Sequence, residues 1–331
     1  MTRLAARTDA RTRNDRILLG SMAIYALVLV GLALCRGVEI TPAVVALAAA
    51  LIAVLALRRR LPFRDWLPLV AVALAYELIR GYRVALAAMV HVAGIVALER
   101  DLLGGNLAPA ILQSAFHPVH GVDPIAVGAT IIYVLHVPLP IAVAGFLWVR
   151  RRGVFYDYVG AMVVLSMAAF ITYLLLPVAP PWWAAAHGFM PGPDGHPAIA
   201  YLQPAAFAGI ADSAGLNGAA VFSVAFGNIS PDQIASFPSI HAAYPFLAFL
   251  VARRVLGRAR WIVLAYAVAA WFSIVYLGDH YLVDVIAGIA YAAGSYWTVV
   301  RGLPLAETAL GSLVARRRSR GAPAGPEPAA P

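Results

Sequence analysis

The chain has 331 residues, of which 62% are hydrophobic and only 12% charged, and its mean hydropathy is +0.80. This composition lies far from that of a soluble domain, so we expect a bilayer to be its solvent. The formal net charge of +9 could suggest nucleic acid as a partner, but the basic residues fall between long apolar runs and form no basic face. Composition therefore predicts an integral membrane protein and argues against nucleic-acid binding.

The apolar runs predict an all-α, polytopic membrane bundle with about eight transmembrane helices, or six to eight when short runs are discounted. A membrane helix needs about 20 mostly apolar residues. The segment from Val84 to Leu98 is apolar too, and fits either a span or a helix that lies in the interface. The eight predicted spans cover residues 17–35, 42–57, 66–79, 124–149, 155–177, 238–256, 261–279 and 281–300.

The arginines predict the orientation, because cytoplasmic loops retain positive charge during insertion. Eight alternating spans place every arginine cluster on one side of the membrane. Both termini are then cytoplasmic, in a multi-pass protein of the plasma membrane. The opposite, extracytoplasmic side keeps only Arg36, Arg80, Arg83 and Arg100.

The chain divides into four predicted regions. They are a cytoplasmic arm (1–16), a membrane hairpin (17–65), a catalytic membrane domain (66–301) and a disordered cytoplasmic tail rich in proline and alanine (302–331). Leu34 stands where a lipoprotein cleavage site before Cys35 would need a small residue, so the first segment is interpreted as a retained span. The extracytoplasmic segments 80–123 and 178–237 are longer than connections require, which favours a functional role for them.

The first candidate for chemistry is the run Gly278-Asp279-His280-Tyr281-Leu282-Val283-Asp284. His280 and Asp284 are four residues apart, a spacing that puts them on one face of a helix starting there. A carboxylate so placed can bind one imidazole nitrogen and leave the other free to attack. The alternative interpretation is a structural pair that holds two helices together. A carboxylate inside an apolar run is costly, however, and favours the functional interpretation.

The second candidate is Ser236-Phe237-Pro238-Ser239-Ile240-His241, at the outer end of the sixth predicted span. Proline suits the first position of a helix, and the amides of the following turn can face an anion. Ser239 adds a hydroxyl and His241 a titratable imidazole. Taken alone, the segment fits an ordinary helix start equally well. The orientation drawn from the arginines, however, puts His241 and His280 at the same membrane face, where they suit phosphoryl transfer as an acid and a nucleophile.

At this point the sequence resembles a known family. Two of its motifs are similar to the second and third motifs of the type 2 phosphatidic acid phosphatase superfamily, and others are similar to its inositol phosphorylceramide synthase branch, in a bacterial form. The resemblance covers about residues 70–295. The motifs are Phe237-Pro238-Ser239-x-His241, His280-Tyr281-x-x-Asp284-x-x-x-Gly288, Ala179-Pro180-Pro181-Trp182 and, more loosely, Tyr133-x-x-His136-x-Pro138 and Tyr76-Glu77-Leu78-Ile79-Arg80-Gly81.

The resemblance implies that His280 takes the phosphoryl group, that Asp284 orients it and that His241 protonates the leaving group. It also implies metal-independent chemistry, so neither a cofactor nor a metal is expected. The superfamily's first motif is absent because the chain has no lysine. Its third motif begins with Ser-Arg, but here Ser273 is followed by Ile274. Arg80 and Arg83 are therefore expected to supply the missing positive charge. The alternative for both is snorkelling to the membrane interface.

The predicted function is phosphotransfer or phosphate hydrolysis on a lipid at the extracytoplasmic face, through a phosphohistidine. The substrate would be a phospholipid or a prenyl phosphate, and the acceptor water or a polyol or sugar. Ser239, Tyr281, Arg80 and Arg83 are the predicted substrate-binding residues. A non-enzymatic flippase or scaffold that retains the fold is the alternative, which survival of function without His280 would favour.

Overall fold

The computed structural model describes residues 64–81, 89–118, 123–136, 138–191, 198–217 and 235–305. Within these ranges the regular secondary structure is helical, apart from two isolated β-bridges. The helices are α3 (Leu67–Gly81), α5 (Ala93–Leu102), α6 (Ala108–Phe116), α7 (Pro124–Val134), α8 (Pro138–Arg150), α9 (Arg152–Leu175), α10 (Pro181–Ala186), α11 (Gln203–Ser213), α13 (Ile240–Val255), α14 (Arg260–Tyr276) and α15 (Leu282–Trp297), with short 3-10 or π turns at Arg64–Trp66, Gly257–Ala259 and Thr298–Gly302.

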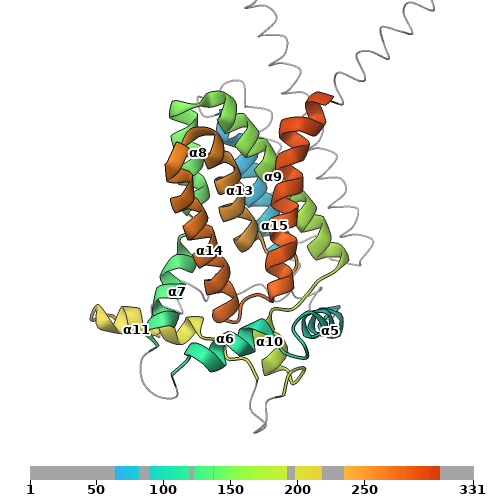
Figure 1. Cartoon of the computed structure of the whole chain (residues 1–331), viewed down its shortest axis with the longest axis vertical. Helices are drawn as coiled ribbons and strands as arrows, with labels where there is room; N and C mark the ends of the chain where they lie inside the picture. Colours follow the sequence, from blue (N-terminus) through green and yellow to red (C-terminus); the bar gives the residue numbers. More distant parts are fainter. Residues whose placement is uncertain are drawn as a thin grey trace, which may run out of the picture.

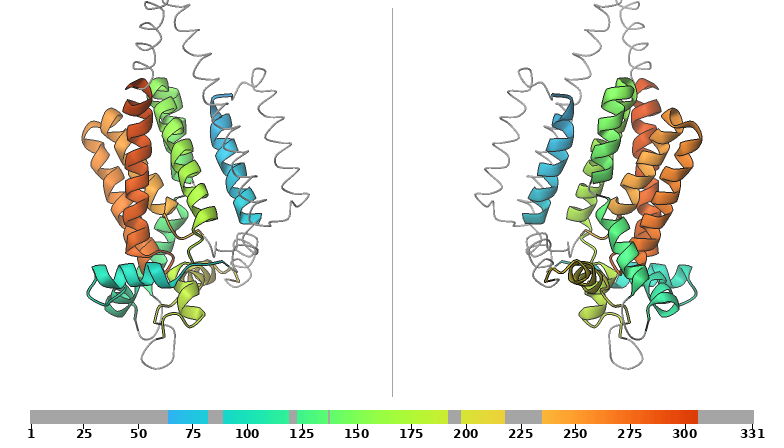
Figure 2. Two further views of the ribbon diagram at one scale, coloured as in Figure 1. Left: turned by 90° about the vertical axis from the view of Figure 1, so that its right-hand side faces the viewer. Right: turned by 90° about the vertical axis from the view of Figure 1, so that its left-hand side faces the viewer.

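Six of these helices, α3, α8, α9, α13, α14 and α15, form an upright bundle (Figures 1 and 2). Helix α9 contacts α3, α8, α13 and α15, and its large side chains are buried on more than one face. Phe155, Tyr158, Leu165 and Tyr173 on α9 are all completely buried. This helix therefore packs against four of the other five helices of the bundle, while α14 packs on α13.

The bundle has the character of a membrane protein. Within the described ranges, the segments Arg152–Leu175, Gly257–Tyr276 and Leu282–Leu305 are long and apolar enough to cross a membrane, and a fourth crossing results if α7 and α8 count as one bent span. Helices α3 and α13 occupy two further predicted spans, but they have 15 and 16 residues, fewer than a span needs. The predicted spans 17–35 and 42–57 lie outside the described residues, so six to eight crossings stay a prediction.

The predicted continuous span 124–149 is wrong in one respect. The structure divides it into α7 and α8, whose axes differ by 42°. Pro138 begins α8, and the residue before a proline is sterically disfavoured in helical conformation. The break places His136 between the two helices.

Four short helices, α5, α6, α10 and α11, lie across the end of the bundle where α13 and α15 begin and α14 ends (Figures 1 and 2). We call them the end layer. Helix α5 belongs to the apolar segment that fitted either a span or an interface helix, and it runs across the bundle end and not along the bundle axis. The end layer comes from the two long segments that the sequence singled out, 80–123 and 178–237.

Candidate active site

The candidate site forms where the starts of α13 and α15 touch. Ser239 caps α13: its Oγ accepts a hydrogen bond from the Ala242 N–H at 3.2 Å, and its own N–H donates to the backbone oxygen of Asp284 at 3.1 Å. A Cβ at Gly288 would lie only 2.2 Å from the Ser239 oxygen. The glycine is thus required for this close approach, which brings the two sequence motifs into contact.

The two histidines of the motifs meet directly. Nδ1 of His241 lies 3.0 Å from Nε2 of His280, within hydrogen-bonding distance. His280 is almost completely buried and His241 is partly exposed. The structure therefore brings together the two residues that the sequence suggested as acid and nucleophile.

Asp284 lies on the opposite side of the His280 ring. Its Oδ2 is 3.4 Å from Nδ1 of His280, and it also accepts a hydrogen bond from the Tyr281 N–H at 2.9 Å. The pair does not share a helix face as expected, because α15 begins only at Leu282 and His280 lies in the turn before it. Asp284 caps its own helix and reaches His280 from there.

Ser236 is a site residue to which the sequence assigned no role. Its Oγ donates to Oδ2 of Asp284 at 2.6 Å, and it lies 3.5 Å from Nδ1 of His280. The Ser236 N–H donates to the Val178 oxygen at 3.1 Å, next to the β-bridge between Val178 and Ala235. Its place in the six-residue motif was the signal available, but the sequence did not indicate which side chain the hydroxyl would face.

Two rings, those of Tyr133 and His136, pack against His241, and we call them the aromatic wall. The ring of Tyr133 stacks on it with centroids 5.1 Å apart, and the ring of His136 meets it edge-on at 4.3 Å. Nδ1 of His136 is hydrogen-bonded to the Tyr133 oxygen. The break between α7 and α8 thus supplies a third imidazole to the site, from a motif that resembled the family only loosely.

The end layer holds the turn that precedes His280. The Gln113 amide donates to the oxygens of Ala200 and Tyr276, both at 2.9 Å, and accepts from the Ala200 N–H at 2.8 Å. The N–H of Trp182 donates to the Gly278 oxygen at 3.0 Å. Gly278 has a φ of +85°, and a Cβ there would lie 2.8 Å from the Ala200 oxygen. These contacts fix the position of the His280 backbone.

Glu99 links the end layer to the catalytic helix. Its side chain is fully buried; Oε1 accepts from the Ala108 N–H at 2.9 Å and Oε2 from the Val283 N–H at 3.2 Å. The carboxylate therefore ties α5 to the first turns of both α6 and α15. Burial raises the pKa of Glu99, an effect that its backbone hydrogen bonds partly oppose.

The predicted substrate-binding residues occupy different positions. Ser239 and Tyr281 are both fully buried beside the histidines, Ser239 as the cap of α13 and Tyr281 in a cluster with Val92, which precedes α5, and Ala179, which precedes α10. Arg80 lies in the last turn of α3, and only its backbone position is described, while Arg83 lies outside the described residues. Phosphate binding by these four residues stays a prediction. Within the described ranges, no three His, Cys, Asp or Glu side chains form a group suited to a metal ion.

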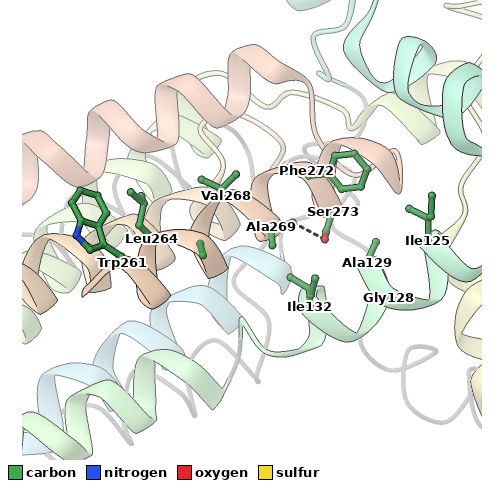
Figure 3. A pocket seen from close by; sticks show the side chains of 11 residues that line it. Ile125, Gly128, Ala129, Ile132, Trp261, Leu264, Val268, Ala269, Phe272 and Ser273 are labelled. Atoms are coloured by element: carbon green, nitrogen blue, oxygen red, sulfur yellow. Dashed lines mark hydrogen bonds between the residues drawn. The ribbon is translucent and has the colours of Figure 1, made fainter. Parts of the chain in front are cut away.

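An apolar groove of about 820 Å³ lies between α7 and α14 (Figure 3). The hydroxyl of Ser273 in its wall donates to Ala269 of the same helix at 2.7 Å, so the groove suits hydrocarbon and offers no charged group. Ile132, at the α7 side, precedes Tyr133 of the aromatic wall in the chain. The groove is lined by Ile125, Gly128, Ala129, Ile132, Trp261, Leu264, Ala265, Val268, Ala269, Phe272 and Ser273.

Comparisons with known proteins identify the family to which the chain belongs. A family model described as the PAP2 superfamily matches residues 93–298. A phosphoinositol dihydroceramide synthase of Bacteroides thetaiotaomicron is 28% identical over 209 residues, which cover 61% of this chain and 65% of that protein. The inositol phosphorylceramide synthase catalytic subunit of Schizosaccharomyces pombe is 27% identical over 203 residues, which cover 59% of this chain and 43% of that subunit. The chain thus spans less than two thirds of the length of either relative. No solved structure matches.

Proposed function

Because the chain belongs to the PAP2 superfamily, we propose that it is an integral membrane phosphotransferase that moves a phosphoryl or phosphodiester group between lipid substrates. The observation that carries this proposal is the row formed by His241, His280 and Asp284. One nitrogen of His280 faces the carboxylate and the other faces His241. Such an arrangement gives one histidine an orienting base and a neighbouring acid.

The proposed reaction has two steps. Nε2 of His280 attacks the phosphorus atom of the lipid, the bond from phosphorus to the departing lipid oxygen breaks, and His241 gives that oxygen a proton. The hydroxyl of the acceptor then attacks the phosphorus, the bond to His280 breaks, and His241 takes the hydroxyl proton. An entering phosphoryl group would replace the direct hydrogen bond between the two imidazoles. Asp284 stabilises the positive charge that develops on His280.

The negative charge of the substrate needs compensation in a site without lysine. Helices α13 and α15 both begin at the site, and the positive ends of their dipoles favour an anion there. We propose that Arg80 and Arg83 add positive charge, because they lie on the same predicted side of the membrane as the site. The apolar groove between α7 and α14 is the place where we expect hydrocarbon of the lipid substrate to lie.

The names of the relatives guide the choice of donor and acceptor. They are named as synthases of inositol phosphorylceramide or of phosphoinositol dihydroceramide. We propose a phospholipid donor and a lipid alcohol acceptor for this chain; water as acceptor would make it a phosphatase. The arginine distribution supports a site at the extracytoplasmic face of the plasma membrane.

A product assay of the purified protein in detergent tests the proposal. Labelled phospholipids and prenyl phosphates are supplied with and without ceramide, inositol or simple alcohols, and products are separated by chromatography. We expect transfer of label to an alcohol acceptor, and none with the His280→Ala variant. If the wild-type protein turns over no donor, or the His280→Ala variant keeps its activity, the enzymatic proposal fails and a flippase or scaffold becomes the better interpretation.

A further inference from the structure

The turn before His280 carries a buried carboxyl group that the proposed reaction does not use. Asp279 has an exposed fraction of only 8%, and its Oδ2 has no hydrogen-bond partner among the described residues. Burial raises the pKa of Asp279 to about 7, although the neighbouring His280 lowers it. An unpaired buried carboxyl group is costly to a fold, so its presence calls for a ligand or a functional reason.

A buried amide whose N–H donors lack acceptors lies in the end layer. Gln203, at the start of α11, is 1% exposed, and its Nε2, which carries two N–H donors, also has no partner among the described residues. Its Oε1 accepts the hydroxyl hydrogen of Tyr201 at 2.7 Å. The site thus contains an unsatisfied acceptor on Asp279 and unsatisfied donors on Gln203.

Tyr201 connects these two groups with the histidines. Burial raises the pKa of Tyr201, and the charge of Asp279 and the hydroxyl of Tyr133 add to that increase, so both lie within electrostatic range of it. Tyr133 in turn stacks on His241. On its other side, Tyr201 stacks against Trp182 with ring centroids 4.6 Å apart. Asp279 therefore lies next to His280 in the chain, and Gln203 is linked to the same turn through the half-buried rings of Tyr201 and Trp182, since the Trp182 N–H donates to the oxygen of Gly278.

The chemistry of these groups discriminates between ligand classes. A phosphate diester offers acceptors for Gln203 but no hydrogen for the Asp279 acceptor, and an ammonium group would satisfy Asp279 but leave the donors of Gln203 unused. A hydroxyl both donates and accepts, so neighbouring hydroxyls satisfy both residues at once. Stacked aromatic rings also offer an apolar face against which the C–H groups of a ring can pack.

We propose that Asp279 and Gln203, with Tyr201 and Trp182 beside them, form a subsite that binds the hydroxyl groups of a polyol carried by the transferred phosphate. This inference rests on the proposed function and goes beyond it by assigning the headgroup to particular residues. Asp279 accepts a hydrogen bond from one hydroxyl, and Gln203 donates to another. The ligand class is a vicinal polyol such as inositol or glycerol.

The test compares headgroups in the purified full-length protein. Initial rates are measured with phosphatidylinositol, phosphatidylglycerol, phosphatidylethanolamine and phosphatidic acid at equal mole fractions in the same detergent. We expect kcat/KM at least about tenfold higher for the two polyol lipids than for phosphatidylethanolamine, which corresponds to about 1.4 kcal/mol. Equal rates with phosphatidylinositol and phosphatidylethanolamine would refute the subsite and leave the phosphotransfer proposal intact. Absence of turnover with every lipid would instead refute the proposed function.

Substitutions test whether Asp279 and Gln203 cause the preference for polyol headgroups. Asp279→Leu and Gln203→Met keep a similar side-chain shape but remove the acceptor oxygens or the amide donors. We expect each to lower kcat/KM for phosphatidylinositol about tenfold, to leave phosphatidylethanolamine within about twofold, and to weaken competitive inhibition by free myo-inositol about tenfold. Asp101→Asn, which removes an exposed carboxylate from α5, is the matched control and should change nothing.

If a variant lowers kcat/KM equally for all lipids, the substituted residue serves the fold or the chemistry, and the subsite is refuted. Size-exclusion profiles and melting temperatures are recorded for each variant beforehand. A correctly folded Asp279→Leu protein that keeps the wild-type preference for inositol would refute it as well.

Discussion

The hydroxyl of Ser236 lies 2.6 Å from Oδ2 of Asp284, closer than the imidazole of His280, which is 3.4 Å away. The same oxygen accepts the Tyr281 N–H at 2.9 Å. Asp284 is thus fixed by three donors, of which only one belongs to the proposed nucleophile. Since Ser236 is held by the Val178 backbone, the segment that follows α9 takes part in positioning the carboxylate.

Removal of this hydroxyl should slow the reaction without unfolding the protein. We expect Ser236→Ala to lower kcat about tenfold, because a hydrogen bond to a charged group contributes about 1.5–3 kcal/mol and part of that is retained by Tyr281. Ser166→Ala removes an equally buried hydroxyl from α9 that is hydrogen-bonded to Met162 and Tyr244 and not to Asp284 or either histidine, and it should leave kcat within about twofold. The measurement is kcat and KM in detergent; a Ser236→Ala enzyme with wild-type kcat would contradict a role in positioning Asp284.

The two histidines should fail at different steps. His280→Ala should abolish both turnover and the covalent intermediate, since the attacking nitrogen is missing. His241→Ala should still form an acid-labile phosphoenzyme from an aryl phosphate, whose leaving group needs little protonation, and should hydrolyse it slowly. Asp284→Asn should lower the rate by orders of magnitude, through weaker histidine orientation and imidazolium stabilisation. Rapid-quench detection of labelled protein distinguishes the three variants, and label on the His280→Ala protein would overturn the assignment.

The close approach of α13 and α15 can be tested at one glycine. Gly288→Ala places a Cβ 2.2 Å from the Ser239 oxygen, so the helices must separate and His241 must move away from His280. We expect at least about a hundredfold loss of kcat, since small displacements of reacting groups have effects of that size. Gly294→Ala lies in the same helix with no atom within 4 Å of the new Cβ, and should retain activity. Comparable activity of the two variants would show that this contact does not determine the geometry of the site.

The stability of the protein should depend on pH through Asp279. Its pKa is raised from 3.8 to about 7 in the folded state, so the folded form holds its proton more tightly than the unfolded form. The contribution of Asp279 to the free energy of unfolding is fully present below about pH 4. It is lost as the pH rises through about 7, because the buried carboxyl group then loses its proton. We therefore expect Asp279→Asn to melt like the wild type at pH 4 and several degrees higher at pH 8.

Melting curves of both proteins across this pH range provide the measurement. The exposed residue Asp101 gives the control, since Asp101→Asn should not alter the pH dependence. A melting temperature of Asp279→Asn that falls relative to wild type as pH rises would show that the carboxylate has a partner in the folded state.

The orientation of the end layer can be measured by labelling. Asn217 follows α11 and is exposed, whereas Arg258 is exposed in the turn between α13 and α14. A cysteine at Asn217, in a background without Cys35, should react with an impermeant thiol reagent in intact cells, because the arginine clusters place this side outside. A cysteine at Arg258 should react only after lysis. The reverse pattern would invert the proposed topology.

Sequence predicted the helices of the bundle well where long apolar runs left little choice. The runs 155–177, 261–279 and 281–300 correspond to α9, α14 and α15, because a mostly apolar segment in a bilayer must satisfy its backbone hydrogen bonds internally. The break between α7 and α8 was missed, although Pro138 was its local signal. The arm and hairpin before residue 64 and the tail lie outside the described residues, and stay predictions.

Sequence by itself determined which residues carry the proposed chemistry: it named His241, His280 and Asp284, because their types and spacing are local properties of two short segments. Only the tertiary structure decided what those residues face. Ser236 meets Asp284 across 48 residues of chain, Gln113 holds the turn at Tyr276 across 163, and Glu99 reaches Val283 across 184. Such contacts depend on how helices pack and on a glycine that lets two of them approach, and neither is encoded in the spacing of any one motif. The unsatisfied pair of Asp279 and Gln203 became visible for the same reason, since burial and a missing partner are properties of the folded chain.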